Sequence, residues 1–459
     1  MISARDINYI YSLKNRLSTA MRCLSKEENK KFITVFILLL LLTTTLIRGQ
    51  DTSSVYSQLD ELTQRVDSLE SLLKKINMDS LKSSNSLVEK IEISTDTSDT
   101  DDLLSKLTSL FSFNEQDQSS KRNRVNQLLQ ALQKQPGKIT FNGDATSILH
   151  WKTGNSHFTN GSGSFDLFAF VGFGNNTNLF INLEAVGGNG LNERINSFAS
   201  LNEDAGSLQD NEGRDLLHVL EAWMEFNFFS DWIKVTIGKI DLTNYFDVND
   251  AANDETMQFL SGPFVNSAAF PVPSNSPGLR TRVGIENLIT FQLGLASSDN
   301  SGSDLFTGLF KIIGTELNAD LGGGYYGKIH FFAYKDGVFR DASGYGFSFA
   351  GTVADRFKLF GRWNENNNNY SKEINTRDFW SIGLEFNSNI FNREVVVGAA
   401  FGELNPFQNR LLNEQVVETY IRFQLNNWIY FSPHLQVIHN TAGSSENHLL
   451  VAVRTQINF

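Results

Sequence analysis

The chain has 459 residues, of which 20% are charged and 12% are aromatic, including 37 Phe. The formal net charge of −12 argues against a general nucleic-acid-binding protein. The sole cysteine, Cys23, excludes an intramolecular disulfide framework and any metal or redox site built from several cysteines.

An apolar run near the N-terminus has the pattern of a secretory signal. Residues 32–47 read FITVFILLLLLTTTLI, and four basic residues precede them within 22–31. A basic region followed by an apolar run is typical of signal peptides, and this run is shorter than the roughly 20 residues of a spanning helix. We therefore expect a signal peptide over residues 1–49, whose true start could be Met21. The alternative is an uncleaved inner-membrane anchor.

Residues 50–93 carry a heptad pattern, in which apolar residues recur at alternating spacings of four and three. The pattern predicts a periplasmic coiled-coil stalk that makes the chain a homo-oligomer, with a trimer as one candidate. An amphipathic helix packed on its own chain is the alternative. The predicted oligomerisation residues are Leu59, Leu62, Val66, Leu69, Leu73 and Ile76, preceded by Val55. Residues 94–137 are predicted to be a polar linker with short helices over Leu103–Phe111 and Val125–Gln133.

From residue 138 onward, segments of about ten residues alternate apolar and polar positions between turn residues, as transmembrane strands do. Within 415–425, for example, Val417, Ile421 and Phe423 alternate with Glu418 and Arg422. The expected strands span 138–150, 164–173, 177–186, 215–228, 232–239, 278–285, 288–296, 304–317, 323–334, 343–353, 356–363, 376–387, 394–402, 415–425, 428–438 and 448–459.

Residues 138–459 are therefore expected to form an all-β transmembrane barrel of about sixteen antiparallel strands. In lipid such a sheet must close, and a barrel of this width holds water rather than packed side chains. We accordingly predict an outer-membrane porin. Its last strand ends on Phe459, which is typical of the strand that outer-membrane assembly machinery recognises.

The polar positions of the expected strands supply the candidate pore lining. Planar guanidinium groups among them can bind sugar hydroxyls or carboxylates. The candidate cations are Lys234, Arg280, Arg282, Lys328, His330, Arg356, Lys358, Arg362, Arg422 and Arg454, and the candidate acids are Asp166, Glu184, Glu221, Glu225, Glu385 and Glu418. The segment from Ile240 to Gly278 is too long and too apolar for a surface loop, so we expect it to fold inward and narrow the pore.

At this loop the chain resembles the carbohydrate-selective porin family of the OprB type. The resemblance rests on LEAWMEFNF (220–228), VTIGKIDLTNYFDVND (235–250), ANDETMQFLSG (252–262) and FPVPSNSPG (270–278). It implies a sixteen-stranded porin that passes sugars, with an inward loop and lumenal arginines at the constriction. By motif it adds the loop positions Lys239, Asp241, Asp247 and Asn249, and it places Arg280 and Arg282 at the constriction.

No sequence motif indicates an enzyme, since the chain contains no G-x-S-x-G, H-E-x-x-H or P-loop pattern. No catalytic residue, metal or cofactor is expected, and the predicted partners are membrane lipid and small polar solutes. Other interpretations remain open at this point: an envelope-tethering structural barrel, a general ion or nutrient porin, an outer-membrane barrel enzyme and a soluble all-β sugar-binding protein.

Overall fold

The computed structural model describes residues 139–459 except 154–156, 174–175, 189, 203–215, 230–231, 274, 286–287, 299–307, 323, 340 and 391. The predicted signal peptide, stalk and linker helices lie outside the described residues. No helix within the described ranges is long and apolar enough to cross a membrane.

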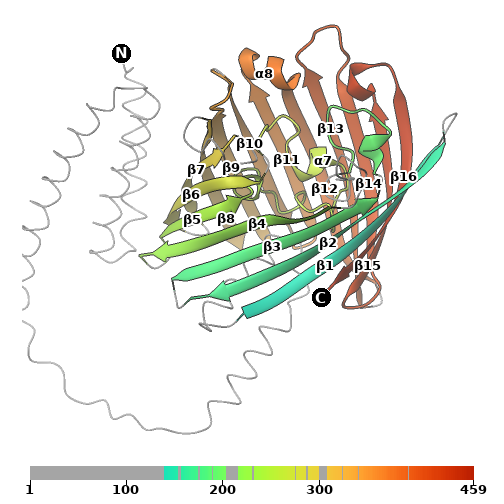
Figure 1. Cartoon of the computed structure of the whole chain (residues 1–459). Helices are drawn as coiled ribbons and strands as arrows, with labels where there is room; N and C mark the ends of the chain where they lie inside the picture. Colours follow the sequence, from blue (N-terminus) through green and yellow to red (C-terminus); the bar gives the residue numbers. More distant parts are fainter. Residues whose placement is uncertain are drawn as a thin grey trace, which may run out of the picture. The chain divides into compact units, whose positions relative to one another are not determined.

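Sixteen antiparallel strands close into one barrel, as predicted (Figure 1). The strands are β1 (Ile139–Lys152), β2 (Phe158–Gly172), β3 (Thr177–Gly188), β4 (Leu216–Phe228), β5 (Ile233–Ile240), β6 (Ser276–Ile285), β7 (Ile289–Ser297), β8 (Leu309–Gly322), β9 (Tyr325–Lys335), β10 (Ser343–Val353), β11 (Phe357–Asn366), β12 (Thr376–Ile390), β13 (Arg393–Pro406), β14 (Glu414–Gln424), β15 (Ile429–His439) and β16 (Asn447–Asn458). Each strand pairs with its neighbours in sequence, and β1 also pairs with β16.

The first strand, β1, pairs with the last strand, β16, and the start of β1 lies beside the end of β16 at one rim. Asp144 of β1 lies opposite Asn458 of β16, and the backbone amides of Gly143 and Phe459 each donate to the other's carbonyl at 2.9 Å. Because the ladder continues through this junction, the sheet leaves no unpaired strand edge, which is what a strand structure in hydrocarbon requires.

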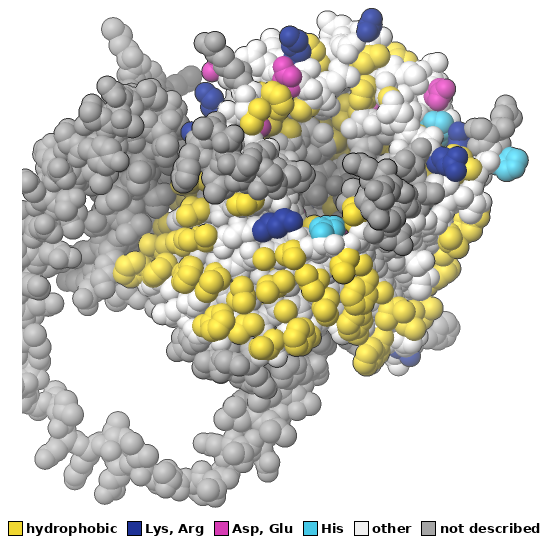
Figure 2. All heavy atoms as spheres, in the orientation of Figure 1, with side chains coloured by type: hydrophobic (Ala, Val, Ile, Leu, Met, Phe, Trp, Pro, Cys, Tyr) yellow, Lys and Arg dark blue, Asp and Glu magenta, His cyan; other side chains and the backbone are white. Residues whose placement is uncertain are grey.

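Side chains alternate between the two faces of the wall along each strand. On β14, Val417, Ile421 and Phe423 are 36–38% exposed, whereas Glu418 is fully buried and Arg422 is 4% exposed. Since successive strand residues point to opposite faces, these apolar residues lie on the outside of the wall and these two charged residues face inward. Figure 2 shows hydrophobic side chains gathered on the outer face of the strands nearest the viewer.

Short and long connections alternate around the barrel. Short turns, such as 229–232 and 354–356, lie at the rim where β1 begins, and the long segments 189–215 and 241–275 lie at the other. The helical turns among the described residues all occur in connections at that second rim, namely η3 (Leu191–Glu193), α6 (Thr243–Phe246), α7 (Gly262–Val265), α8 (Asn368–Ile374) and η4 (Thr441–Gly443). Porins place their long loops on the outer side of the membrane and their short turns on the periplasmic side.

Candidate functional site

The connection between β5 and β6, residues 241–275, folds into the barrel, and we call it the inner loop. Its large apolar side chains Phe246, Phe259 and Phe264 are at most 1% exposed, and it hydrogen-bonds to inward-facing side chains of the wall. Burial of these rings explains why a segment of this composition does not extend into solvent. The predicted inward loop is therefore present.

Arg362 of β11 is the main polar anchor of the inner loop. Its side chain is fully buried, and its Nε donates to Asp247 Oδ1 at 3.0 Å. Its terminal nitrogens donate to the loop oxygens Asp247 O (3.2 Å), Asn253 Oδ1 (3.3 Å), Phe264 O (2.9 Å), Val265 O (3.0 Å) and Ala252 O. A guanidinium whose donors are used in this way holds the loop and has little capacity left for a passing solute.

Two further arginines of the wall bind backbone carbonyls of the same loop. Arg422 Nη1 donates to Met257 O at 2.7 Å, while its Nη2 lies 3.0 Å from Glu394 Oε2. Arg454 Nη1 donates to Glu255 O at 2.7 Å and to Gln258 O at 2.8 Å. Arg422, predicted as a pore-lining cation, thus contacts the loop backbone.

Glu418 of β14 accepts hydrogen bonds from backbone amides of the inner loop. Its two carboxylate oxygens accept the amides of Leu260 at 2.8 Å and Ser261 at 2.9 Å. His434 Nδ1 lies 2.8 Å from Glu418 Oε1, and both side chains are fully buried. Hydrogen bonds that involve a charged group are among the stronger ones in proteins. Glu418 therefore holds backbone amides of the inner loop, and the arginines hold backbone carbonyls of the same loop.

Glycines of the wall receive the α6 end of the inner loop. A Cβ at Gly294 would lie 2.9 Å from the Phe246 ring, and a Cβ at Gly314 would lie 2.8 Å from it. The ring therefore reaches the backbone of β7 and β8 at two positions without side chains. The absence of Cβ atoms at these two positions is what allows α6 to approach the wall.

Three loop residues predicted by motif, Asp241, Asp247 and Asn249, make contacts that hold the inner loop in its conformation. Burial raises the pKa of the Asp247 carboxyl, whereas Arg362 and the amide of Ser267, which donates to Asp247 Oδ2 at 2.5 Å, lower it. Asn249 Nδ2 donates to Ser348 Oγ at 3.0 Å and to the carbonyl of Phe349 at 2.8 Å. Asp241 Oδ1 accepts the amide of Thr243 at 2.8 Å and so supports the first turn of α6.

Arg280 of β6 lies at a second contact between loop and wall. Its guanidinium carbon is 4.1 Å from the centroid of the Tyr245 ring, which belongs to α6. Its Nε donates to Gln292 Oε1 at 2.8 Å, and its Nη1 lies 3.8 Å from Glu225 Oε2. The arrangement places a cation, a carboxylate, an amide and an aromatic ring together where the loop meets the wall.

Arg282 and Lys234 lie next to this group on the inner face. The two residues are directly opposite each other in the β5–β6 ladder, and Thr236 lies opposite Arg280 in the same ladder. Arg282 is 6% exposed, and Lys234 is partly buried. The structure therefore brings Arg280, Arg282 and Lys234 together on one stretch of the wall.

Two predicted pore residues lie elsewhere. Lys239 lies two residues after Ile237 and therefore on the same face of β5, the outer face, where Ile237 is 48% exposed. The Nζ of Lys239 donates to the carbonyl of Val219. Arg356 is exposed in the turn between β10 and β11, one residue before β11 begins. The period of two that sets the facing of a strand residue accounts for Lys239. Arg356 lies outside the wall because β11 begins one residue later than expected, at Phe357.

The sequence analysis missed a row of aromatic residues on the inner face. Phe170 of β2 lies opposite Phe180 of β3, which lies opposite Trp223 of β4, and each successive pair of ring centroids is 5.0 Å apart. We call these three residues the aromatic row. They were missed because apolar strand residues were expected to face lipid. Each ring is an even number of residues away from an inward-facing polar residue of its own strand, namely Asp166, Asn182 and Glu225, and this spacing predicts that the rings also face inward.

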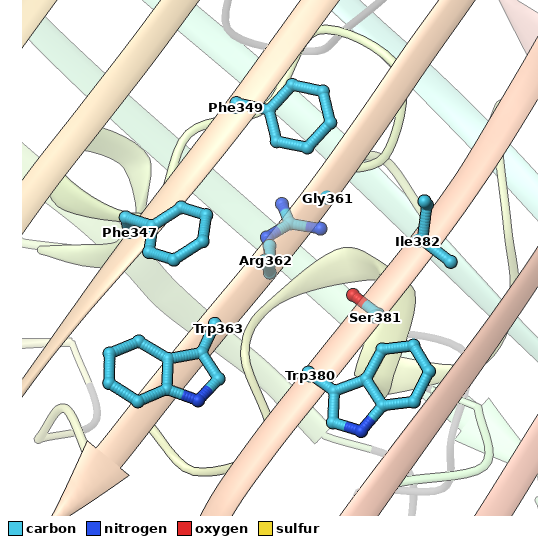
Figure 3. A pocket seen from close by; sticks show the side chains of 8 residues that line it. All are labelled: Phe347, Phe349, Gly361, Arg362, Trp363, Trp380, Ser381 and Ile382. Carbon is cyan, nitrogen blue, oxygen red and sulfur yellow. The ribbon is translucent and has the colours of Figure 1, made fainter.

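A hollow of about 530 Å³ lies on the outer face between β10, β11 and β12. Its lining includes the rings of Phe347, Phe349, Trp363 and Trp380, which surround Gly361 in Figure 3. Because Arg362 makes its bonds on the opposite face of the wall, this hollow lies on the outer face, away from the inner loop.

No group of three or more His, Cys, Asp or Glu side chains among the described residues is arranged to hold a metal ion.

Comparisons with known proteins agree with this geometry. The family model "Carbohydrate-selective porin, OprB family" matches residues 338–459. An uncharacterized protein of Aquifex aeolicus (strain VF5) is 25% identical over 266 residues, which cover 57% of this chain and 78% of that protein.

Among solved structures, the high-pH structure of Pseudomonas putida OprB has a TM-score of 0.56 at 14% identity and covers 70% of this chain and 94% of that one. Its low-pH structure has a TM-score of 0.50 at 15% identity, with 75% and 99% covered. The predicted resemblance is therefore confirmed: this chain has the sixteen-stranded barrel fold of OprB, and its residues 338–459 match the OprB family of carbohydrate-selective porins.

Proposed function

We propose that this protein is an outer-membrane channel through which small carbohydrates diffuse passively. The observation that carries the proposal is the inner loop, which is held inside a closed barrel by Arg362, Arg422, Arg454 and Glu418. A closed wall provides a path across the membrane, and a rigidly held loop narrows that path to a constant size. The match to the carbohydrate-selective porin family supports sugars as the solute class.

Selection is proposed to occur beside Arg280, where the loop meets the wall through Tyr245. A sugar could exchange its water for hydrogen bonds to Arg280, Arg282, Gln292 and Glu225 at little net free-energy change. Its apolar ring face could lie against an aromatic side chain. Arg362 and Arg422 are not assigned to the solute, because their donors are used by the loop and by Glu394.

The proposal is tested by single-channel recording of the full chain in planar bilayers, with and without mono- and disaccharides. We expect stable conductance steps that sugars reduce in a saturable way. Steps that no sugar blocks would instead indicate a general ion or nutrient porin. A barrel that folds, as shown by heat-dependent gel mobility, and never conducts would indicate a structural envelope protein.

A further inference from the structure

Two lysines face each other on the outer surface of the barrel wall. Lys311 of β8 lies directly opposite Lys335 of β9. Each lies an even number of residues from an exposed apolar residue of its own strand, Ile313 (37% exposed) or Phe331 (48% exposed), so both lysines are on the outer face. Both side chains are exposed. We call these two residues the lysine pair.

The lysine pair carries more positive charge than the described residues around it compensate. Lys335 Nζ lies 3.6 Å from Asp341 Oδ1, and both side chains are exposed. Lys311 forms no ion pair within the ranges that the structure describes. Like charges directly opposite each other in a sheet repel, and one exposed carboxylate compensates at most one of the two. The lysine pair therefore favours a further anion.

The position of the lysine pair restricts the kind of anion that fits. Lys311 is the third residue of β8 and Lys335 is the last of β9, so both lie at the second rim, where the long connections are. On its other side Lys311 lies opposite Leu295 of β7. The ammonium groups are thus at the rim, next to an apolar outer surface. A headgroup with a negative charge on an apolar tail matches both features.

The apolar outer surface continues from the lysine pair to the hollow between β10, β11 and β12. Phe331 is four residues from Lys335, about 13 Å at 3.3 Å per strand residue. Its ring centroid is 6.2 Å from that of Phe347 on β10, which is 5.9 Å from that of Trp363 on β11. Phe347 and Trp363 line the hollow of about 530 Å³ (Figure 3). The surface below the lysine pair is therefore aromatic and leads into the hollow.

We propose that the lysine pair binds the phosphate of a membrane lipid, and that one acyl chain of this lipid lies over Phe331 and enters the hollow. The phosphate accepts charge-assisted hydrogen bonds from both ammonium groups, which removes their mutual repulsion. An acyl chain in one leaflet extends about 15 Å, half of the hydrocarbon core, and so reaches the level of Phe347. The proposal rests on the membrane location in the proposed function, but not on conduction.

Binding can be measured on the full chain in dodecyl maltoside by native mass spectrometry. The two probes, dipalmitoyl phosphatidic acid and dipalmitoylglycerol, differ only in the phosphate. We expect the barrel to retain phosphatidic acid in a saturable way and to retain dipalmitoylglycerol much more weakly. K311Q/K335Q should weaken phosphatidic acid binding about thirtyfold, which corresponds to about 2 kcal/mol.

Matched variants separate this site from general charge and from free phosphate. K372Q/R410Q removes the same charge from exposed residues in α8 and in the connection after β13, at the same rim, and should leave binding unchanged. Ile382→Trp fills the hollow and should weaken phosphatidic acid binding several-fold. The soluble headgroup sn-glycerol 3-phosphate should not compete. Heat-dependent gel mobility shows that each variant still forms the barrel.

Equal phosphatidic acid affinity of K311Q/K335Q and the wild type, or equal binding of the two lipids, would overturn the phosphate site. Unchanged affinity of Ile382→Trp would overturn the placement of the acyl chain. Competition by sn-glycerol 3-phosphate would indicate a site for soluble phosphates and overturn the lipid as its occupant. Single-channel recording tests the channel separately: a barrel that binds the lipid and never conducts loses the channel function and keeps this site.

Discussion

Replacing Arg362 by alanine should release the inner loop from the wall. The substitution removes all six hydrogen bonds that the guanidinium makes to the loop and leaves the Asp247 carboxylate fully buried without its cation. Breaking a buried ion pair by removing one partner typically costs about 3–5 kcal/mol. We expect a loss of that size in the free energy of unfolding, together with a larger and noisier conductance step.

The matched control is Arg377→Ala. Arg377 also makes an ion pair, with Asp378 at 3.1 Å, but its side chain is 46% exposed. Exposed pairs contribute about 0–1 kcal/mol, so this variant should keep both its stability and its conductance. Urea unfolding of the barrel in lipid, followed by tryptophan fluorescence, measures the first quantity, and single-channel recording measures the second.

The double variant R362M/D247N separates loss of the pair from loss of the fold. Removing both charges eliminates the uncompensated carboxylate, so it should recover part of the stability that Arg362→Ala loses while still leaving the loop loosely held. If Arg362→Ala unfolds at the wild-type urea concentration and keeps the wild-type conductance, Arg362 does not anchor the loop.

Three further predictions concern the proposed solute contacts, the seating of the inner loop and the predicted stalk. Replacing Arg280 and Arg282 by alanine should weaken block of the ion current by sugar at least several-fold while the barrel still folds; unchanged block would reject their role. Gly314→Val should push the Phe246 ring from the wall and cost about 1–3 kcal/mol, with Gly351→Val as a control because nothing nearer than 3.7 Å faces a Cβ there; equal stability of the two variants would contradict the proposed seating. Deleting residues 52–80 should leave the barrel folded but change the oligomer size measured by light scattering, and an unchanged size would reject the stalk.

The sixteen strands could be predicted because the information for them is local. Alternation with a period of two and turn residues between runs are set by neighbours in sequence, so each expected strand appears in its place. The largest difference at a strand start is in β2, which begins at Phe158 instead of residue 164. The added residues include Gly161 and Gly163 on the outer face, where the expected apolar signal is missing.

The roles of the predicted cations could not be predicted from the local sequence. Arg280 and Arg362 both lie at inward positions of strands, and nothing adjacent to either one distinguishes the proposed solute contact from a loop anchor. The difference arises because Arg362 meets residues 247–265 of the folded loop, which are about one hundred positions away in the chain. Lys239 shows the opposite case, since its parity with Ile237 predicts the outer face even though the family motif suggested the pore.

The sequence by itself determined that a closed barrel forms and where its strands lie, because these properties follow from short-range alternation and from the need to satisfy every backbone group in lipid. Only the tertiary structure decided which inward charges hold the inner loop. That decision depends on where one long loop contacts the opposite wall, and contacts between distant parts of a chain leave no local pattern.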